Sequence, residues 1–311
     1  MRVLTVNLTS TKLKKQFIFG GNYAKKENDL AIEVEVKKYM SSLKDEAVVK
    51  ISNLTQSEIT QIIMGEFYDV DIYCGYRNGN IQKIFSGGVF YISNTLNENK
   101  TNTCIIICTS KLVAKYGQNR INLTLNSGIN LYSAVKFICK RAGIPNANVS
   151  EQLKKDFIQE ILSVNDTASS WLDKLCKQNN SLIQNADSIL DQTFSIFDAA
   201  KSNNRCIKLL PDNIIVTGGF PRLTNDGLDI TILPTFSFMC GDTIQIDNSI
   251  IDVSASSKSE VSKNYGVQFS QYGQYMIFEM KYHLQNRGSA FTLKMLCKNR
   301  DKISAYVGGV K

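Results

Sequence analysis

The chain has 311 residues, of which 43% are hydrophobic and 21% charged, a composition typical of folded globular proteins and not of disordered ones. Its length predicts two or three domains of ordinary size. Lys and Arg total 36 against 28 Asp and Glu, a formal net charge of +8. The excess lies at the ends, with 10 basic and 6 acidic residues in 1–50 and 9 and 4 in 251–311. Basic residues spread singly in this way are typical of a solvated surface, although a basic face for an acidic partner or nucleic acid stays open.

The cysteines and the N-terminus predict a reducing compartment. None of the eight cysteines forms a Cys-x-x-Cys pair, and the single histidine, His283, cannot by itself build a histidine-containing metal cluster. Most cysteines lie in apolar runs, as Cys104 and Cys108 do, which predicts small buried side chains. The first residues lack the apolar core and cleavage site of a signal peptide, and no run approaches the roughly 18 apolar residues of a membrane span. We therefore expect synthesis in a cytoplasm and no membrane partner.

The N-terminal part has the patterns of strands and one short helix. Three strands are predicted, over residues 3–8, 31–36 and 48–54. In the second, Glu33 and Glu35 alternate with apolar residues, which is the period of a half-buried strand. These carboxylates are therefore predicted to form a solvated strand face, not a pair of catalytic acids. Thr55 and Glu58 have the spacing of a capping box, and helical periodicity then continues up to Gly65.

A β-hairpin is the clearest prediction in the sequence. Over residues 66–93, two alternating runs of β-branched and aromatic residues flank Asn78 and Gly79. Because both residues tolerate positive φ, this dipeptide predicts a hairpin closed by a type I′ turn. A further strand over 103–110 is long enough to pair beside it.

Between residues 111 and 205 the period changes from two to three and four, which predicts helices. They begin at Asn130, at Ser150 and near Asp166. Their inward-facing positions are Leu131, Ala134, Val135, Ile138 and Ala142 in the first helix, Leu153, Phe157, Ile161 and Leu162 in the second, and Trp171, Leu175 and Cys176 in the third. Trp171 is therefore predicted to be a core residue and not a platform for ligand stacking. Short strands are predicted over 181–184 and 195–197.

Strands return in the last third of the chain. They are predicted over residues 206–210, 214–217, 228–236, 242–246, 275–284 and 290–297, with a flexible Ser- and Lys-rich loop over 254–264. Many short strands at close spacing indicate a barrel or a sandwich.

No set of residues in the sequence predicts catalysis or metal binding. His283 lies at a strand position beside a turn, where a strand-surface histidine is expected. Asp69 and Asp71 share a strand face without a third ligand nearby. Asp242 follows a glycine at a turn, where an Asp carboxylate usually accepts local N–H bonds. The Gly-Gly pairs lack the context of a phosphate-binding loop. We assign no catalytic, cofactor-binding or metal-binding residue and do not expect an enzyme.

Two blocks of sequence carry a family resemblance. The first is the short helix with the hairpin after it, and its matching positions are Leu54, Ile59, Ile62, Gly65, Val70, Gly75, Tyr76, Ile81, Ile84, Phe85 and Gly87. The second lies towards the C-terminus, with Gly219, Phe220, Pro221, Leu233, Pro234, Gly241, Asp242 and Thr243, and then a closing hairpin over 275–297. In this order the features resemble the baseplate hub proteins of tailed bacteriophages and related contractile injection machines. The resemblance covers about residues 50–95 and 206–297.

The resemblance implies a mainly β chain with a helical insertion. It places a first tube-like β-barrel domain at 1–115, an α-rich inserted domain at 116–205 and a second tube-like β-barrel domain at 206–311. It also implies a structural, non-enzymatic protein of the virion tail baseplate. Three chains would form a ring of six similar barrels that adapts the sixfold tail tube to the threefold spike.

The partners that the resemblance implies are the other chains of the homotrimer and the spike, tail tube, tape-measure and baseplate wedge proteins. Phe67, Tyr73 and Tyr91 are candidates for contacts within the ring, because closing a threefold ring buries strand edges and apolar rims, with core packing as the alternative. No cofactor is implied.

Two other functions stay open. The basic ends and the run 294–302 suit a nucleic-acid-binding module, whose affinity would fall steeply with added salt; we do not expect specific nucleic-acid binding. A tail-tip cell-wall hydrolase is the third possibility, and His283 would be its most obvious catalytic candidate.

Overall fold

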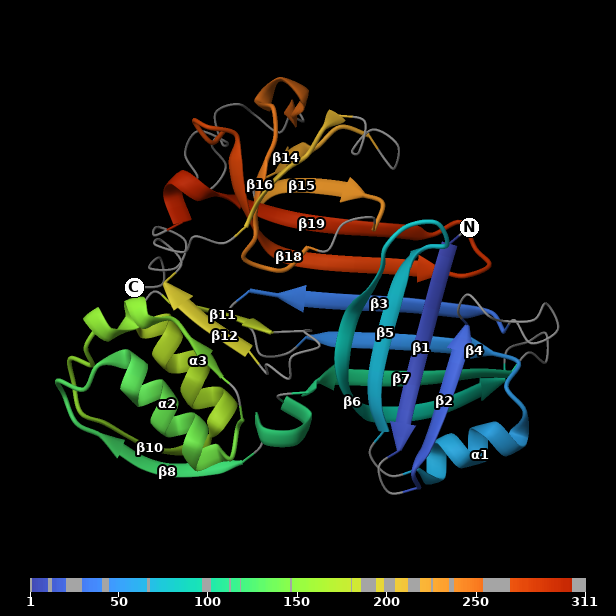
Figure 1. Cartoon of the computed structure of the whole chain (residues 1–311), viewed down its shortest axis with the longest axis horizontal. Coiled ribbons are helices and arrows are strands. Elements are labelled where there is room, and N and C mark those ends of the chain that lie inside the picture. The colour runs from blue at the N-terminus through green and yellow to red at the C-terminus, as the bar shows by residue number, and fades with distance from the viewer. Residues whose placement is uncertain are drawn as a thin grey trace.

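The computed structural model of the chain is mainly β, with three α-helices in its described part (Figure 1). The predicted class, a β protein with a helical segment, is therefore confirmed. The described residues are 2–10, 13–20, 30–40, 45–65, 68–96, 102–111, 113–117, 119–145, 147–179, 181–185, 194–198, 205–211, 219–224, 226–234, 238–253 and 269–303.

One 14-stranded sheet contains strands from both ends of the chain. Its N-terminal strands are β1 (Arg2–Ser10), β2 (Lys15–Gly20), β3 (Ile32–Tyr39), β4 (Glu46–Ser52), β5 (Tyr68–Tyr76), β6 (Ile81–Leu96) and β7 (Asn102–Ser110). Its C-terminal strands are β13 (Cys206–Lys208), β14 (Arg222–Thr224), β15 (Gly227–Ile232), β16 (Thr243–Gln245), β17 (Asp252–Val253), β18 (Gln274–Gln285) and β19 (Phe291–Asn299). The strand order is β17-β14-β15-β19-β18-β3-β4-β7-β6-β5-β1-β2, with β16 beside β18 and β13 beside β16.

The two β regions join where β3 pairs antiparallel with β18, in seven residue pairs from Tyr39 opposite Glu279 to Glu33 opposite Gln285. We call this pairing the β3–β18 seam. A second contact reinforces it, because Arg2 donates hydrogen bonds to the carbonyls of Gly288 and Ser289 in the β18–β19 turn. Since each region's sheet continues into the other, the described strands leave free ends at β2, at β17 and, on the branch through β16, at β13. The predicted closure into barrels is therefore not confirmed, and the division into domains remains a prediction.

The hairpin of β5 and β6 is confirmed, but its predicted turn is wrong. Neither Asn78 nor Gly79 has positive φ, and a type I′ turn requires positive φ at both central residues. Instead, the amide of Gly79 donates to the carbonyl of Tyr76 at 2.9 Å. The turn is thus centred one residue earlier, on Arg77 and Asn78, where the chain reverses without left-handed backbone.

Local signals place the helices well. In α1 (Gln56–Met64), the side chains and amides of Thr55 and Glu58 make the reciprocal bonds of the capping box. Asn130 caps α2 (Leu131–Ala142) by accepting from the Ser133 amide at 2.8 Å. Gly143 ends α2 in the left-handed region, with φ of 72°, a conformation that costs glycine little.

The α-rich part lies beside the large sheet (Figure 1). Besides α2 it contains η2 (Val113–Gly117), β8 (Arg120–Leu125), β9 (Asn148–Val149), η3 (Glu151–Lys155), β10 (Leu162–Thr167), α3 (Ala168–Gln178), β11 (Ser181–Asn185) and β12 (Phe194–Asp198). The second predicted helix is mostly wrong, because the segment capped by Ser150 is the single turn η3. Phe157 and Ile161, predicted to be inward, are 48% and 65% exposed. After η3 the chain instead extends into β10, which pairs with β8.

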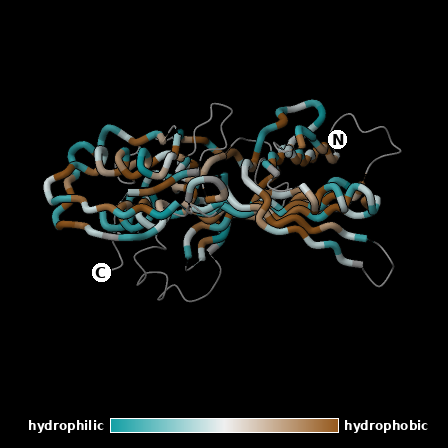
Figure 2. The backbone as a smooth tube through the Cα atoms, turned by 90° about the horizontal axis from the view of Figure 1, so that it is seen from below, coloured by the Kyte–Doolittle hydropathy of each residue, from teal (hydrophilic) through white to brown (hydrophobic). Residues whose placement is uncertain are grey.

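Two hydrophobic clusters form the core. The larger consists mainly of side chains from the strands of the large sheet, and the smaller of side chains from α2, α3 and the strands of the α-rich part. Figure 2 shows hydrophobic segments running together along neighbouring strands. The β11–β12 hairpin has a face in each cluster: Leu182 and Phe197 belong to the larger, and Ile183 and Ile196 to the smaller. Among the described residues no helix has the length and apolar character needed to span a bilayer.

Candidate functional site

Exposed apolar side chains lie on both sides of the free strand edge at one end of the large sheet, because Ile18 projects from the face of β2 opposite to Lys15, which contacts α1. β2 pairs with β1 on one side and has no partner on its other side among the described residues. Its Ile18 is 61% exposed, and at the end of α1 Ile63 and Met64 are 54% and 73% exposed. Lys15 Nζ donates to Gln61 Oε1 at 3.3 Å and so joins β2 to α1. We call this set, with the outer edge of β2, the β2 edge surface. Unpaired strand edges are templates for pairing with another chain.

A second apolar feature is a bulge in β6. The register against β7 shifts between Val89 and Tyr91, so Phe90 is the extra residue. Bulges re-aim side chains, and here Phe90 and Tyr91 are 78% and 54% exposed. Of the three aromatic candidates for contacts within the ring, Tyr91 points outward. Tyr73 is half-buried, with Lys83 Nζ 5.5 Å from its ring centre, and Phe67 lies outside the described residues.

The carboxylates of Glu33 and Glu35 and the imidazole of His283 come together at the β3–β18 seam. All three side chains are partly exposed, as expected of a strand face. His283 lies opposite Glu35 in the register, and its Nε2 is 3.8 Å from Glu33 Oε1. Sequence reasoning treated these residues separately, because no local pattern relates positions 250 apart.

The other aspartates singled out in the sequence have structural partners. Asp71 forms an ion pair with Lys83 at 3.1 Å. Asp242 is buried; it accepts from the Met239 amide at 2.9 Å, as predicted, and also binds Arg205, whose Nη2 is 2.5 Å from Oδ2. Charge-assisted pairing of this kind holds a turn in place.

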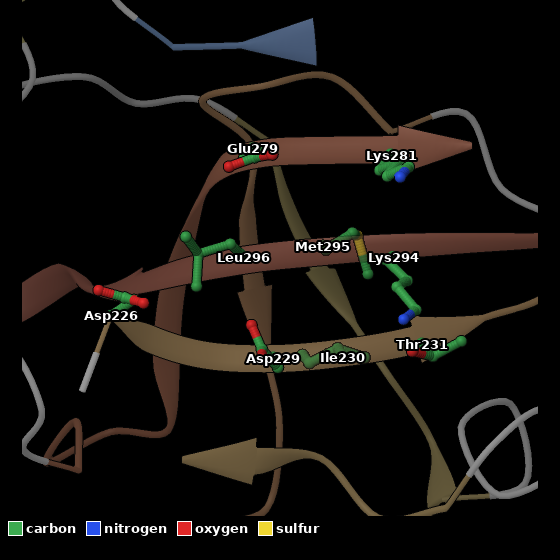
Figure 3. Close-up of a pocket in the computed structure, with 9 residues that line it drawn as sticks. All are labelled: Asp226, Asp229, Ile230, Thr231, Glu279, Lys281, Lys294, Met295 and Leu296. Atoms are coloured by element: carbon green, nitrogen blue, oxygen red, sulfur yellow. The ribbon is translucent and has the colours of Figure 1, made fainter. Parts of the chain in front are cut away.

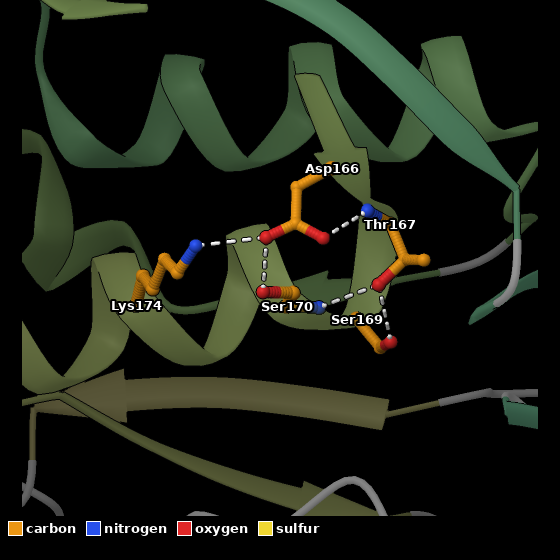
Figure 4. A network of polar contacts seen from close by, with 5 residues as sticks. All are labelled: Asp166, Thr167, Ser169, Ser170 and Lys174. Atoms are coloured by element: carbon orange, nitrogen blue, oxygen red, sulfur yellow. Dashed lines mark hydrogen bonds and ion pairs between the residues drawn. The ribbon is translucent and has the colours of Figure 1, made fainter. Parts of the chain in front are cut away.

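Asp166 stabilises the N-terminus of α3 through side-chain contacts that the sequence did not predict. Its carboxylate accepts from Lys174 Nζ at 2.8 Å, from Ser170 Oγ at 2.7 Å and from the Thr167 amide at 2.7 Å (Figure 4). The Lys174 bond, followed by the Ser170 and Thr167 bonds, holds the pKa of Asp166 well below its usual range. This network fixes the start of α3, and Thr167 is its N-cap. Trp171, one turn later, is a core residue as predicted.

A buried lysine lies in the larger core. Lys38 is 5% exposed, and burial lowers its pKa while the charge of Asp45 opposes that change. Sequence reasoning missed it, although the alternation of residues 32–36, continued by two residues, places Lys38 on the apolar face. Seven of the eight cysteines are buried and Cys206 is exposed; burial raises the pKa of Cys108 to about 12, which makes its thiol unreactive.

A shallow hollow of about 260 Å³ lies over β15, β18 and β19. Figure 3 shows its charged side chains: Asp226, Asp229, Glu279, Lys281 and Lys294. Burial raises the pKa of Asp229, and the negative charge of Asp226 adds a smaller rise. Because the three carboxylates lie toward one end of the hollow and the two lysines toward the other, it does not present a field of one sign to a ligand.

No protein-family model matches this sequence, and no curated protein matches it either. Solved structures, however, match nearly the whole chain. The 43 kDa tail protein of prophage MuSo2 from Shewanella oneidensis superposes with a TM-score of 0.61 at 10% identity, over 96% of this chain and 98% of its own. The chain thus has the fold of a phage tail protein, and the resemblance found in the sequence is confirmed at that level.

Two structures from bacterial systems share this fold. The E. coli c3393 protein, described as a component of the type VI secretion system with structural similarity to the T4 bacteriophage tail proteins gp27 and gp5, gives a TM-score of 0.57 at 8% identity, over 86% of this chain and 73% of its own. A chain of the PdpA–VgrG complex in its lidless form gives a TM-score of 0.58 at 11% identity, over 97% of this chain and 65% of its own.

Proposed function

We propose that the protein is a structural hub of a phage tail baseplate. In this role three chains form a ring that joins the sixfold tail tube to the threefold spike, each chain contributing two tube-like β regions. The observation that carries the proposal is the match of fold over 96% of this chain and 98% of a prophage tail protein. Tail tube, spike, tape-measure and wedge proteins are its proposed partners, and the virion tail is its proposed location.

The β2 edge surface is an argument for the proposed ring. A threefold ring closes through heterologous contacts, in which one surface of each chain meets a different surface of the next. A free strand edge flanked by Ile18 and Met64 suits such a contact, because its backbone groups and apolar side chains are both buried on pairing. The protein in this proposal acts by assembly and catalyses no reaction.

Light scattering at several salt concentrations tests the ring. We expect a mass three times the 34.8 kDa of one chain that persists at high salt, and co-purification with tube and spike proteins of the same tail. The variants Ile18→Lys and Met64→Lys should yield monomers. Ile161→Lys is the matched control, because Ile161 is equally exposed but lies in the α-rich part.

Two results would contradict the proposal. One is a monomer at every concentration that also fails to bind tube or spike proteins. The other is tight binding to DNA that weakens steeply with added salt, which would favour the nucleic-acid-binding alternative.

A further inference from the structure

Four polar side chains form a square on the outer face of the β3–β18 seam. Glu33 and Glu35 alternate with buried residues on β3, and His283 and Gln285 do so on β18. In the register, Glu35 lies opposite His283 and Glu33 opposite Gln285. The four side chains therefore project from the same side of the sheet, with two from each of the β regions.

Three of the four carry atoms that bind metal ions. One oxygen from each carboxylate and one imidazole nitrogen all lie within 4.8 Å of one another. A zinc ion bound at about 2.0–2.2 Å from such atoms needs them slightly closer, and the 3.8 Å between His283 Nε2 and Glu33 Oε1 is near that spacing. One imidazole with two carboxylates suits zinc and related divalent ions better than calcium or magnesium.

We propose that Glu33, Glu35 and His283 bind a divalent transition-metal ion, preferentially zinc, across the β3–β18 seam. Water completes the coordination, since all three side chains are partly exposed. Because the two carboxylates come from the N-terminal region and the imidazole from the C-terminal region, the ion joins the two parts of the sheet at the place where they meet.

Two lysines compete with the ion. Lys50 Nζ is 3.0 Å from Glu33 Oε1, and Lys281 Nζ is 3.5 Å from Glu35 Oε2. Their side chains are 40% and 42% exposed, and exposed pairs of this kind contribute little to stability, so both ammonium groups can turn into solvent. The partial burial of Glu33 opposes its ionisation, but Lys50, Gln285 and His283 together outweigh it and lower the pKa of Glu33.

Zinc chloride titrated calorimetrically into the full, tag-free chain tests the site. His283→Gln should weaken binding at least about tenfold, since even the loss of a partner outside the coordination sphere costs a site about 10- to 100-fold in affinity. Lys281→Met should instead tighten binding, because it removes a competitor for Glu35. Asp71→Asn is the matched control: it also removes a strand-face carboxylate paired with a lysine, and it should leave zinc affinity unchanged.

The position of the ion has its own readout. Zinc binds the folded chain, so it should raise the unfolding temperature, and EDTA should reverse the rise. Hydrogen exchange should slow at the amides of β3 and β18 in particular, and neither effect should occur in His283→Gln. Equal zinc affinity in the wild-type chain and His283→Gln would overturn the proposal, as would zinc binding without added protection at the seam. The square would then be a ladder of ion pairs and hydrogen bonds.

Discussion

Replacing Leu284 by Ala tests whether the two hydrophobic clusters unfold separately. Leu284 is fully buried in β18, opposite Val34 of β3. The substitution removes the equivalent of three methylene groups, a transfer term of about 2.4 kcal/mol at about 0.8 kcal/mol for each. The cavity left behind raises the expected loss of stability to about 3–5 kcal/mol. That is a large part of the free energy that keeps a domain folded.

Two probes distinguish the clusters in urea unfolding. Labelling of the Cys104 and Cys108 thiols, read by peptide mass spectrometry, follows the larger cluster in which they are buried, whereas the fluorescence of Trp171, the one tryptophan of the chain, follows the smaller cluster. Leu284→Ala should lower the midpoint of the labelling transition and move the fluorescence transition much less. Leu172→Ala, a fully buried change in the smaller cluster, should do the reverse.

Equal shifts of both transitions in both variants would refute this reasoning. The coupling would then pass through the β11–β12 hairpin, whose Leu182 packs in the larger cluster while the neighbouring Ile183 packs in the smaller. A chain that unfolds in a single step would also contradict the predicted domain division at residues 115 and 205.

Three further predictions follow from single sites. Gly87→Ala should destabilise the fold by about 1–3 kcal/mol, measured by urea unfolding, because the new Cβ would lie 2.2 Å from the Thr109 carbonyl oxygen. Because the pKa of Glu33 is lower in the folded chain than its unfolded-state value near 4.5, its ionisation contributes stability that is complete above that value and is lost as pH falls through the folded-state pKa. Glu33→Gln should therefore reduce the loss of thermal stability in acid. With a thiol reagent at pH 8, the native chain should show one fast-reacting cysteine, and Cys206→Ser should abolish it, because the other seven are buried.

Elements whose signals are local were predicted well. The boundaries of α1 and α2 depend on the side chains of Thr55, Glu58 and Asn130, which bond amides three residues away, so a few consecutive residues contain the information. The hairpin of β5 and β6 was predicted from alternation alone. The type of turn could not be predicted, because it depends on the register of the two strands. That register is shifted by bulges where β6 pairs with β5 and with β7.

Features that depend on distant residues could not be predicted. Leu153, Phe157 and Ile161 have helical spacing, but a helix here would need a neighbouring element to bury its apolar face. The segment instead extends into β10, which pairs with β8. The β3–β18 seam joins residues about 250 positions apart. His283 therefore looked isolated in the sequence, although it lies beside two carboxylates in the fold.

The seam also bears on how the chain could serve as a hub. Two domains joined by a linker move relative to each other unless the interface between them is large and hydrophobic. Here the two β regions share a continuous sheet, with Leu284 packed against Val34 across the seam and Arg2 bonded to the β18–β19 turn. Relative motion of the regions would have to break these backbone pairs together. The proposed hub role requires the two β regions to keep a fixed orientation, and pairing within one sheet provides that rigidity without a large separate interface.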